Sequence, residues 1–393
     1  MGWQETSKVI ERMKFVLEYK SGRWTMTELC ERFGISRPTG YSTIRKYEAE
    51  GPEGLRDHSR KPHSCPHQTK EETRKRILEL KEEQPLFGAK KIRRVLKEEG
   101  CEPLPAKSTI HALLERNGLV KHRKKTRHKS EHPGKPYVET EAPNDVWAAD
   151  FKGEFKTLDG VYCYPLTIMD LHTRFILKVK ALPGTKTQPV ISNFLDAFRR
   201  FGLPKCILTD NGVPFATTGF MGFSQLNVWW LTLGITHLRT EPSSPAQNGI
   251  LERMHRELKA ATTRPPAKNM QAQQRVFYDY RHNYNVRRPH EAIDDFPAKL
   301  YVPSERQLPS PIPKPVYPQH FETRLVSGNG SVRFRGPVVY FSQAMRGLEL
   351  GFEDIGDGIW NVYFYERLLG RLDERTLKLN TYTTVSTMYP VSV

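Results

Sequence analysis

The sequence predicts a multidomain chain with an all-α amino-terminal part, a central α/β domain and a small β-barrel at the carboxyl end. A length of 393 residues is enough for about two to four domains. Apolar residues follow helical spacing over the first 120 residues, whereas alternating strand and helix patterns begin near residue 144. After a proline-rich stretch at 301–318, short apolar stretches punctuated by glycine run through 319–393, and these predict the barrel.

The bulk composition indicates a partner that is a polyanion. The formal charge is +17 and the isoelectric point about 9.6, which favours nucleic acid, although a generally basic soluble protein is the alternative. The five cysteines include no C-x-x-C pair, so we expect free thiols and a cytoplasmic protein acting on DNA. There is no run of 18 apolar residues, so no membrane span is expected.

Residues 1–60 have the pattern of a helix-turn-helix DNA-binding domain. Thr27 is expected to cap one helix, Gly34 to end it and Ser36 to cap the next. A plain helical hairpin is the alternative interpretation. In the DNA-binding interpretation, the second helix presents four side chains to a groove: Arg37, Thr39, Ser42 and Arg45.

Residues 70–120 repeat this helical pattern and predict a second, less sharply defined helix-turn-helix domain. A basic linker follows at 121–143, with six lysines and arginines between positions 121 and 129. Such a block cannot form a core, so it is either a solvated tether or a segment lying along DNA phosphates. Its expected phosphate contacts are Lys121, Arg123, Lys124, Lys125 and Arg127.

Residues 144–300 predict three consecutive strands, then a helix, a strand, a helix, a strand and two further helices. This order is typical of the α/β ribonuclease-H-like fold. Three carboxylates occupy informative positions in it. Asp150 lies midway along the first strand, Asp210 ends the fourth, and Glu252 lies in the first turns of the helix after the fifth.

Strand ends and a facing helix are expected to bring these three carboxylates together. Mg²⁺ prefers carboxylate oxygens together with phosphate and water, and two ions about 4 Å apart can hold the attacking and leaving oxygens of a phosphoryl transfer. Each residue alone has an ordinary explanation: a solvated strand end, a turn formed by "DNG", or a solvated helix face. The combination in this fold order is what favours a metal site.

Three segments carry a family resemblance: "DVWAADFKG", "ILTDNGVPFA" and "SPAQNGILERMHRELK". They resemble the signature segments of insertion-sequence transposases of the DDE superfamily and of retroviral integrases. The resemblance implies that Asp150, Asp210 and Glu252 are catalytic and bind Mg²⁺ or Mn²⁺, as two ions. It also implies cleavage of element ends at terminal inverted repeats and joining of the freed 3′-hydroxyl to target DNA. The interval of 41 residues between Asp210 and Glu252 is longer than is commonest in the family.

The expected partners are double-stranded DNA, as element ends and target, and further copies of the chain, at least a dimer by family analogy. Expected DNA contacts in and after the core are Asn248, His255, Lys259, Arg287 and Arg288. His255 could equally be a satisfied helix residue, and the arginines could belong to a structural turn. Two other functions remain open: a non-catalytic DNA-binding regulator, which the intact triad disfavours, and an RNA-cleaving nuclease, which leaves the tandem helix-turn-helix units unexplained.

Overall fold

The computed structural model describes five stretches of the chain: 7–57, 68–120, 138–217, 223–240 and 249–381. The chain divides into two compact units, residues 1–70 and 71–393. None of the helices in the described stretches is both long and apolar enough to span a bilayer.

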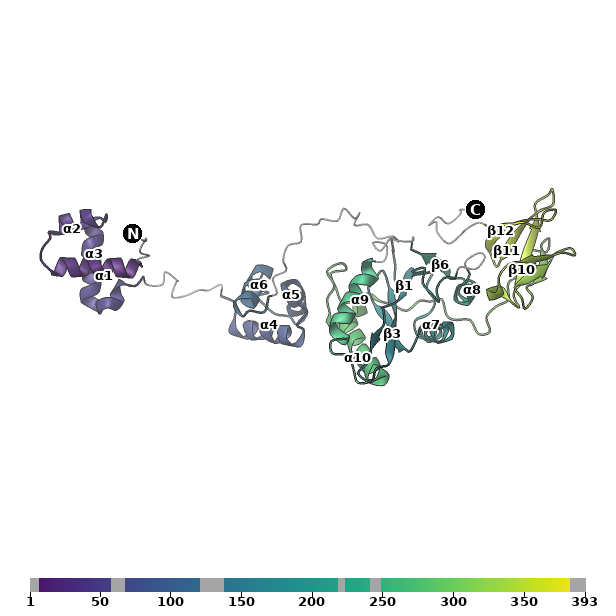
Figure 1. The fold of residues 1–393 in the computed structure, drawn as a ribbon, viewed down its shortest axis with the longest axis horizontal. Coiled ribbons are helices and arrows are strands. Elements are labelled where there is room, and N and C mark those ends of the chain that lie inside the picture. The colour runs from purple at the N-terminus through teal and green to yellow at the C-terminus, as the bar shows by residue number, and fades with distance from the viewer. Residues whose placement is uncertain (1–6, 58–67, 121–137, 218–222, 241–248, 382–393) are drawn as a thin grey trace. The chain divides into compact units, whose positions relative to one another are not determined.

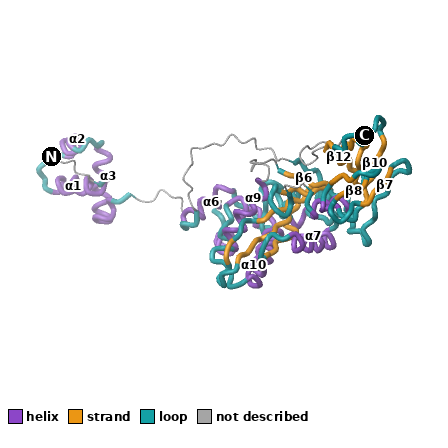
Figure 2. The backbone as a smooth tube through the Cα atoms, turned by 45° about the vertical axis from the view of Figure 1, so that its right-hand side comes forward, coloured by secondary structure: helices purple, strands orange, loops and turns teal. Residues whose placement is uncertain are grey.

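The first unit is a bundle of three helices (Figure 2). These are α1 (Lys8–Lys20), α2 (Met26–Arg32) and α3 (Arg37–Glu50), and a 3₁₀ turn at Gly51–Leu55 follows. Its buried core gathers one apolar face from each element: Phe15, Val16, Leu29, Cys30, Ile44 and Leu55. The helical periodicity of the sequence therefore does form one small core, as expected of an amphipathic bundle.

The cap of α2 differs from the prediction by two residues. Thr25, not Thr27, is the N-cap, because Glu28 reaches back to the Thr25 backbone amide (2.9 Å) and forms a reciprocal capping box. Ser36 caps α3, as predicted. Gly34 lies between the two helices at φ +64°, a conformation that favours glycine. The helix–turn–helix layout is therefore present in the described part of this unit.

The second unit begins with three further helices around a core of their own. They are α4 (Glu71–Glu83), α5 (Ala89–Glu98) and α6 (Lys107–Arg116). Ile77, Ile92, Leu96 and Ile110 are among the residues buried between them.

A mixed β-sheet forms the centre of the second unit. Its strands are β1 (Val146–Phe151), β2 (Phe155–Lys156), β3 (Tyr162–Asp170), β4 (Ile176–Leu182), β5 (Cys206–Thr209) and β6 (Thr236–Arg239). The order is β2-β3-β1-β5-β6, and β4 also pairs with β3. β3 runs antiparallel to β1 and β4, whereas β1, β5 and β6 are parallel. The predicted order of strands is confirmed, with β2 as a short addition.

Helices cover both faces of this sheet (Figure 1). One face packs on α7 (Thr187–Phe201) and α8 (Gln225–Thr232), and the other on α9 (Gly249–Thr262) and α10 (Met270–His282). Successive residues of a strand point to opposite faces. Accordingly Trp147 and Ala149 pack with α7 and α8, while Val146 and Ala148 pack with α9 and α10. A π-helical turn at Asn283–Arg287 and a short helix, α11 (Pro297–Leu300), end the domain.

The proline-rich segment from 301 onward has no strand or long helix before residue 322. Arg306 fixes part of it to the core by donating hydrogen bonds to the backbone carbonyls of Pro204 (2.8 Å) and Gly234 (3.0 Å).

The carboxyl-terminal part is all-β, as predicted, but the described residues do not close into a barrel. Its strands are β7 (Glu322–Leu325), β8 (Ser331–Arg333), β9 (Val338–Tyr340), β10 (Glu349–Asp354), β11 (Ile359–Phe364), β12 (Arg367–Asp373) and β13 (Leu379–Thr381). Five of them form an open antiparallel sheet, β13-β12-β11-β10-β7, whose two edge strands do not pair with each other, and β8 and β9 form a separate hairpin.

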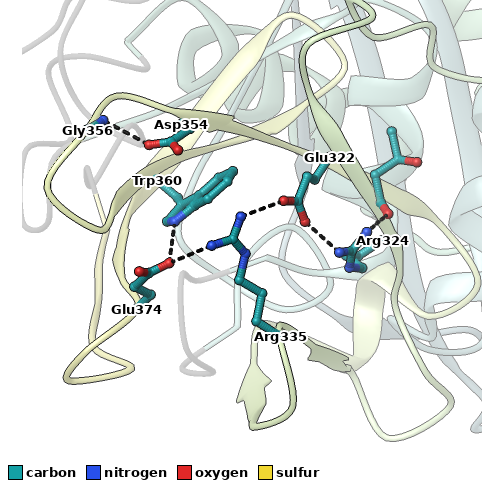
Figure 3. Close-up of polar contacts among 8 residues, drawn as sticks. Glu322, Arg324, Arg335, Asp354, Gly356, Trp360 and Glu374 are labelled. Atoms are coloured by element: carbon teal, nitrogen blue, oxygen red, sulfur yellow. Dashed lines mark hydrogen bonds and ion pairs between the residues drawn. The ribbon is translucent and has the colours of Figure 1, made fainter.

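Arg335 links this hairpin to the five-stranded sheet (Figure 3). Its guanidinium pairs with Glu322 (2.9 Å) and Glu374 (3.3 Å) and lies 4.5 Å from the centre of the Trp360 ring. The indole of Trp360 also donates to Glu374 (3.0 Å). Because these partners come from strands far apart in sequence, the cluster has a structural role: it holds the sheet and hairpin around their common apolar core.

Candidate active site at the ends of β1 and β5

Two of the three predicted carboxylates lie at the carboxyl ends of neighbouring strands. β1 and β5 are parallel, and Ala148 is in register with Leu208. Asp150 and Asp210 each follow these residues by two positions. Ala148 and Leu208 both belong to the face that packs on α9, so strand alternation directs Asp150 to that face as well, and Asp210 follows the same parity just past β5.

The third carboxylate comes from the helix that covers this face. Leu251, Met254, His255 and Leu258 form the buried side of α9, while Glu252 is exposed in its first turn. Glu252 lines an open cavity of about 590 Å³ together with Asp150, Lys152, Arg256, Lys259 and Arg264. One carboxylate and several cations of the same helix therefore border the same space as Asp150.

Asp150 lies in an environment that disfavours its charged form. Its side chain is 19 % exposed. Its pKa is raised to about 7, mainly by burial, next by the nearby charge of Asp210 and, to a smaller extent, by that of Glu252. The opposing influences are the Phe151 backbone amide and the charge of Lys152. An isolated, solvated strand end has none of these properties, so Asp150 is electrostatically part of a cluster with the other two carboxylates.

His255 faces the protein interior. Its Nε2 lies 2.7 Å from the Thr167 hydroxyl, and its Nδ1 lies 3.7 Å from Oδ2 of Asp150. Burial, assisted by the charge of Lys152, lowers its pKa to about 3, so the ring is neutral at pH 7. The alternative of a satisfied helix histidine describes this placement better than a DNA contact.

The other expected DNA contacts divide into three groups. Arg37, Thr39 and Arg45 are exposed on α3 and Ser42 is half-buried there, while Lys259 and Arg287 are exposed in the second unit. Arg288 instead forms an ion pair with Glu257 and stacks on Tyr284, so it is committed to the fold. Lys121, Arg123, Lys124, Lys125, Arg127 and Asn248 lie outside the described residues.

The donor chemistry of the site fits a divalent cation, but the geometry is open. Three carboxylates from β1, the end of β5 and α9 offer the hard oxygen ligands that Mg²⁺ and Mn²⁺ take. Among the described residues, however, no group of three acidic, histidine or cysteine side chains is close enough to hold one ion. The expected closed cage is therefore absent from this conformation, in which α9 begins right after the undescribed stretch 241–248.

Several residues of the site escaped sequence analysis. Thr167 belongs to no recognisable motif, Thr209 lies within "ILTDNGVPFA" but is not distinguished by it, and His237 lies in a short strand with an ordinary pattern. All three are buried and hydrogen-bonded beside the aspartates. The one signal that could have found them is the strand register, which the sequence does not reveal.

Comparison with known proteins agrees with this architecture. Family models described as "Helix-turn-helix domain" and "Homeodomain-like domain" match residues 11–63 and 39–114. Two models described as "Integrase core domain" match 140–245 and 233–297. The fold and the site thus define a protein with helix-turn-helix units ahead of an integrase core.

Two curated relatives are products of insertion elements. An uncharacterized 39.2 kDa protein of insertion element IS476 from Xanthomonas euvesicatoria is 26 % identical over 234 residues, covering 59 % of this chain and 64 % of that protein. An uncharacterized 31.7 kDa protein of IS407 from Burkholderia multivorans is 25 % identical over 221 residues, covering 56 % and 76 %. The integrase-core matches and these two relatives support an insertion-sequence transposase of the DDE superfamily.

Among solved structures, the HTLV-2 integrase catalytic core domain in complex with magnesium is similar. It is 17 % identical and its match covers 41 % of this chain and 98 % of that one, with a TM-score of 0.33.

Proposed function

We propose that the protein is a DNA transposase that binds the terminal inverted repeats of an insertion sequence and catalyses metal-dependent strand cleavage and strand transfer. The observation that supports the proposal is that Asp150 and Asp210 lie at adjacent strand ends, while Glu252, on the helix that covers this face, borders the same cavity as Asp150. Its domains would be two helix-turn-helix regions at 1–60 and 70–120, a basic linker, a catalytic core at 144–300, a proline-rich linker at 301–318 and a β domain at 319–393.

In this proposal Asp150, Asp210 and Glu252 hold one or two Mg²⁺ or Mn²⁺ ions. When bound, such ions neutralise phosphate charge and favour in-line displacement at phosphorus. The chain's own cations complete the site: Lys259, Arg256 and Arg264 border the cavity and would contact DNA phosphates on either side of the reacting one. With metal and DNA bound, Glu252 would have to lie closer to the strand ends than it does in this conformation.

DNA binding would be distributed over the chain. The exposed Arg37, Thr39 and Arg45 on α3 are placed to enter a groove, and the segment 121–129 would follow the backbone. Two element ends have to be joined in one reaction, so we infer a homo-oligomer of at least two chains, with the β domain contributing to DNA or subunit contacts.

The decisive experiment is Mg²⁺-dependent nicking and joining of a duplex carrying an element end. Wild type is expected to act only with metal, whereas Asp150→Asn, Asp210→Asn and Glu252→Gln bind the duplex but do not cut it. Asp279→Asn is the matched control, because Asp279 is exposed on α10 and lies outside the cavity lining. Equal nicking by wild type and Asp150→Asn refutes the site. Binding without nicking by wild type itself favours the regulator.

A further inference from the structure

Asp150 and Asp210 are also held through their backbone carbonyls, which accept hydrogen bonds from threonine hydroxyls. The Thr167 hydroxyl donates to the backbone carbonyl of Asp150 (3.0 Å), and the Thr209 hydroxyl donates to the backbone carbonyl of Asp210 (2.9 Å). Both threonines are fully buried. Each aspartate is thus held at its backbone by a hydroxyl rather than by a side-chain partner.

A buried histidine supports each of these hydroxyls. Nε2 of His255 lies 2.7 Å from the Thr167 hydroxyl, and Nε2 of His237 lies 2.9 Å from the Thr209 hydroxyl. A hydroxyl has one proton, and in both cases it is already given to the aspartate carbonyl. This arrangement lets Nε2 of each histidine donate to the hydroxyl oxygen.

The tautomer of His237 has independent support. Its Nδ1 lies 3.0 Å from the amide nitrogen of Asn227, which also donates to the Phe215 carbonyl (2.8 Å). That nitrogen is a donor, so Nδ1 of His237 accepts and Nε2 carries the proton. The resulting chain of donors runs in one direction, from α8 through β6 and β5 to Asp210.

The first relay connects the elements that carry two different carboxylates. His255 follows Glu252 by three residues on α9, Thr167 lies in β3, and Asp150 lies opposite Thr167 in β1. One hydrogen-bonded path therefore runs from α9 through β3 to β1. It constrains where the first turn of α9 can sit relative to Asp150, which sets the distance between Glu252 and Asp150.

We infer that the Thr167–His255 and Thr209–His237 pairs are positioning residues that preorganise the metal-binding carboxylates of this chain, an inference that rests on the proposed function. Hydrogen-bonded partners behind metal ligands typically contribute 10- to 100-fold to affinity or activity. The hydroxyls touch no substrate in this arrangement; they act through the backbone of Asp150 and Asp210 and through the placement of α9.

The test uses the full chain and a readout other than activity. This readout is Mn²⁺ binding, measured as the loss of the electron-paramagnetic-resonance signal of free Mn²⁺. Thr167→Val and Thr209→Val keep the shape of the side chain and remove the hydroxyl, and each is expected to weaken Mn²⁺ binding by about 10-fold or more. Thr167→Ser and Thr209→Ser retain the hydroxyl and are expected to stay within about 3-fold of wild type.

Two further variants separate positioning from general damage. Thr262→Val removes another buried hydroxyl, on α9 itself, whose partner is the Leu258 carbonyl (2.7 Å). It is expected to lower the melting temperature without changing Mn²⁺ affinity. The double variant Thr167→Val with His255→Phe removes donor and acceptor together, which avoids an unpaired buried group, and it is expected to fold yet bind Mn²⁺ as weakly as Thr167→Val.

The outcomes distinguish this inference from the proposed function. If wild type binds Mn²⁺ and Asp150→Asn does not, while both valine variants bind as wild type does, the positioning role is refuted and the proposed function stands. Serine variants as defective as the valine variants also refute it. If wild type and Asp150→Asn bind Mn²⁺ equally, the proposed metal site itself is wrong and this inference falls with it.

Discussion

Removing the charge of Asp150 is expected to stabilise the metal-free catalytic core at pH 8. Burial and the neighbouring carboxylates raise the Asp150 pKa to about 7, against an ordinary value of 3.8. Between these values the folded chain holds a proton that the unfolded chain has lost, so the free energy of unfolding falls as pH rises through this window. Above pH 7 the whole penalty is present, and below pH 3.8 none of it is.

The size of the penalty follows from the same two values. At about 1.4 kcal/mol for each tenfold change in equilibrium, the upper limit is about 4 kcal/mol, and relaxation around a 19 % exposed side chain brings the expected effect to about 2 kcal/mol or more. Asp150→Asn resembles the protonated carboxyl in shape and removes this pH dependence. It should therefore gain about 2 to 4 kcal/mol over wild type at pH 8 and little at pH 4.

Hydrogen exchange of β1 and β3 peptides, measured in EDTA at several pH values and corrected for intrinsic exchange rates, reports the stability of the core itself in a multidomain chain. Asp279→Asn is the control, and it should follow wild type at every pH. The reasoning is refuted if Asp150→Asn exchanges no more slowly than wild type at pH 8, or if its advantage is the same at pH 4 and at pH 8.

Three other outcomes can be checked. Phe198→Ala is expected to destabilise the core by about 3 to 5 kcal/mol in urea unfolding, because Phe198 is fully buried against Trp147 and Phe194; a loss under 1 kcal/mol would contradict this packing. Arg288→Ala leaves Glu257 without its ion-pair partner and should lower the free energy of unfolding by about 1.5 to 3 kcal/mol, while DNA affinity stays at the wild-type value. A selective loss of DNA affinity would instead support Arg288 as a phosphate contact. If Arg45 contacts one phosphate, Arg45→Ala should reduce the slope of log affinity for end DNA against log salt concentration by about 0.9. An unchanged slope counts against that contact.

The sequence predicted those features that depend on local chemistry. Ser36 and Gly34 delimit the helices of the first unit because capping and left-handed backbone are decided within a few residues. The placement of Asp150 on the first strand and of Asp210 at the end of the fourth followed from strand pattern and element order, although Asp150 lies nearer the strand end than the predicted midpoint. Even there the prediction of Thr27 as the cap was wrong, since Thr25 is the threonine that has Glu28 at the reciprocal position.

What the sequence could not provide are contacts between elements far apart in the chain. Arg288 looked free for DNA because nothing local indicates that Glu257, a helix earlier, faces it. His255 looked exposed beside Glu252, although its ring turns inward to Thr167, 88 positions away. Closure of the carboxyl-terminal sheet is likewise a property of its edge strands, and β7 and β13 do not pair in the described residues. Pairing at this range depends on register and packing, which pattern alone does not fix.

The pKa of Asp150 and the two threonine–histidine relays together explain how the fold can keep Asp150 and Asp210 at adjacent strand ends without a cation. Mutual repulsion and burial push Asp150 toward its neutral form, and on their own would favour moving the strand ends or α9 apart. The relays oppose that movement with neutral hydrogen bonds anchored in buried threonines, so their strength does not depend on whether the carboxylates are charged. A site built this way stores unfavourable electrostatic energy in the free protein, and this energy is released when positive charge enters. Such preorganisation should make cation binding stronger than three mobile carboxylates could achieve. The strength of cation binding then depends on buried residues that do not contact the ion.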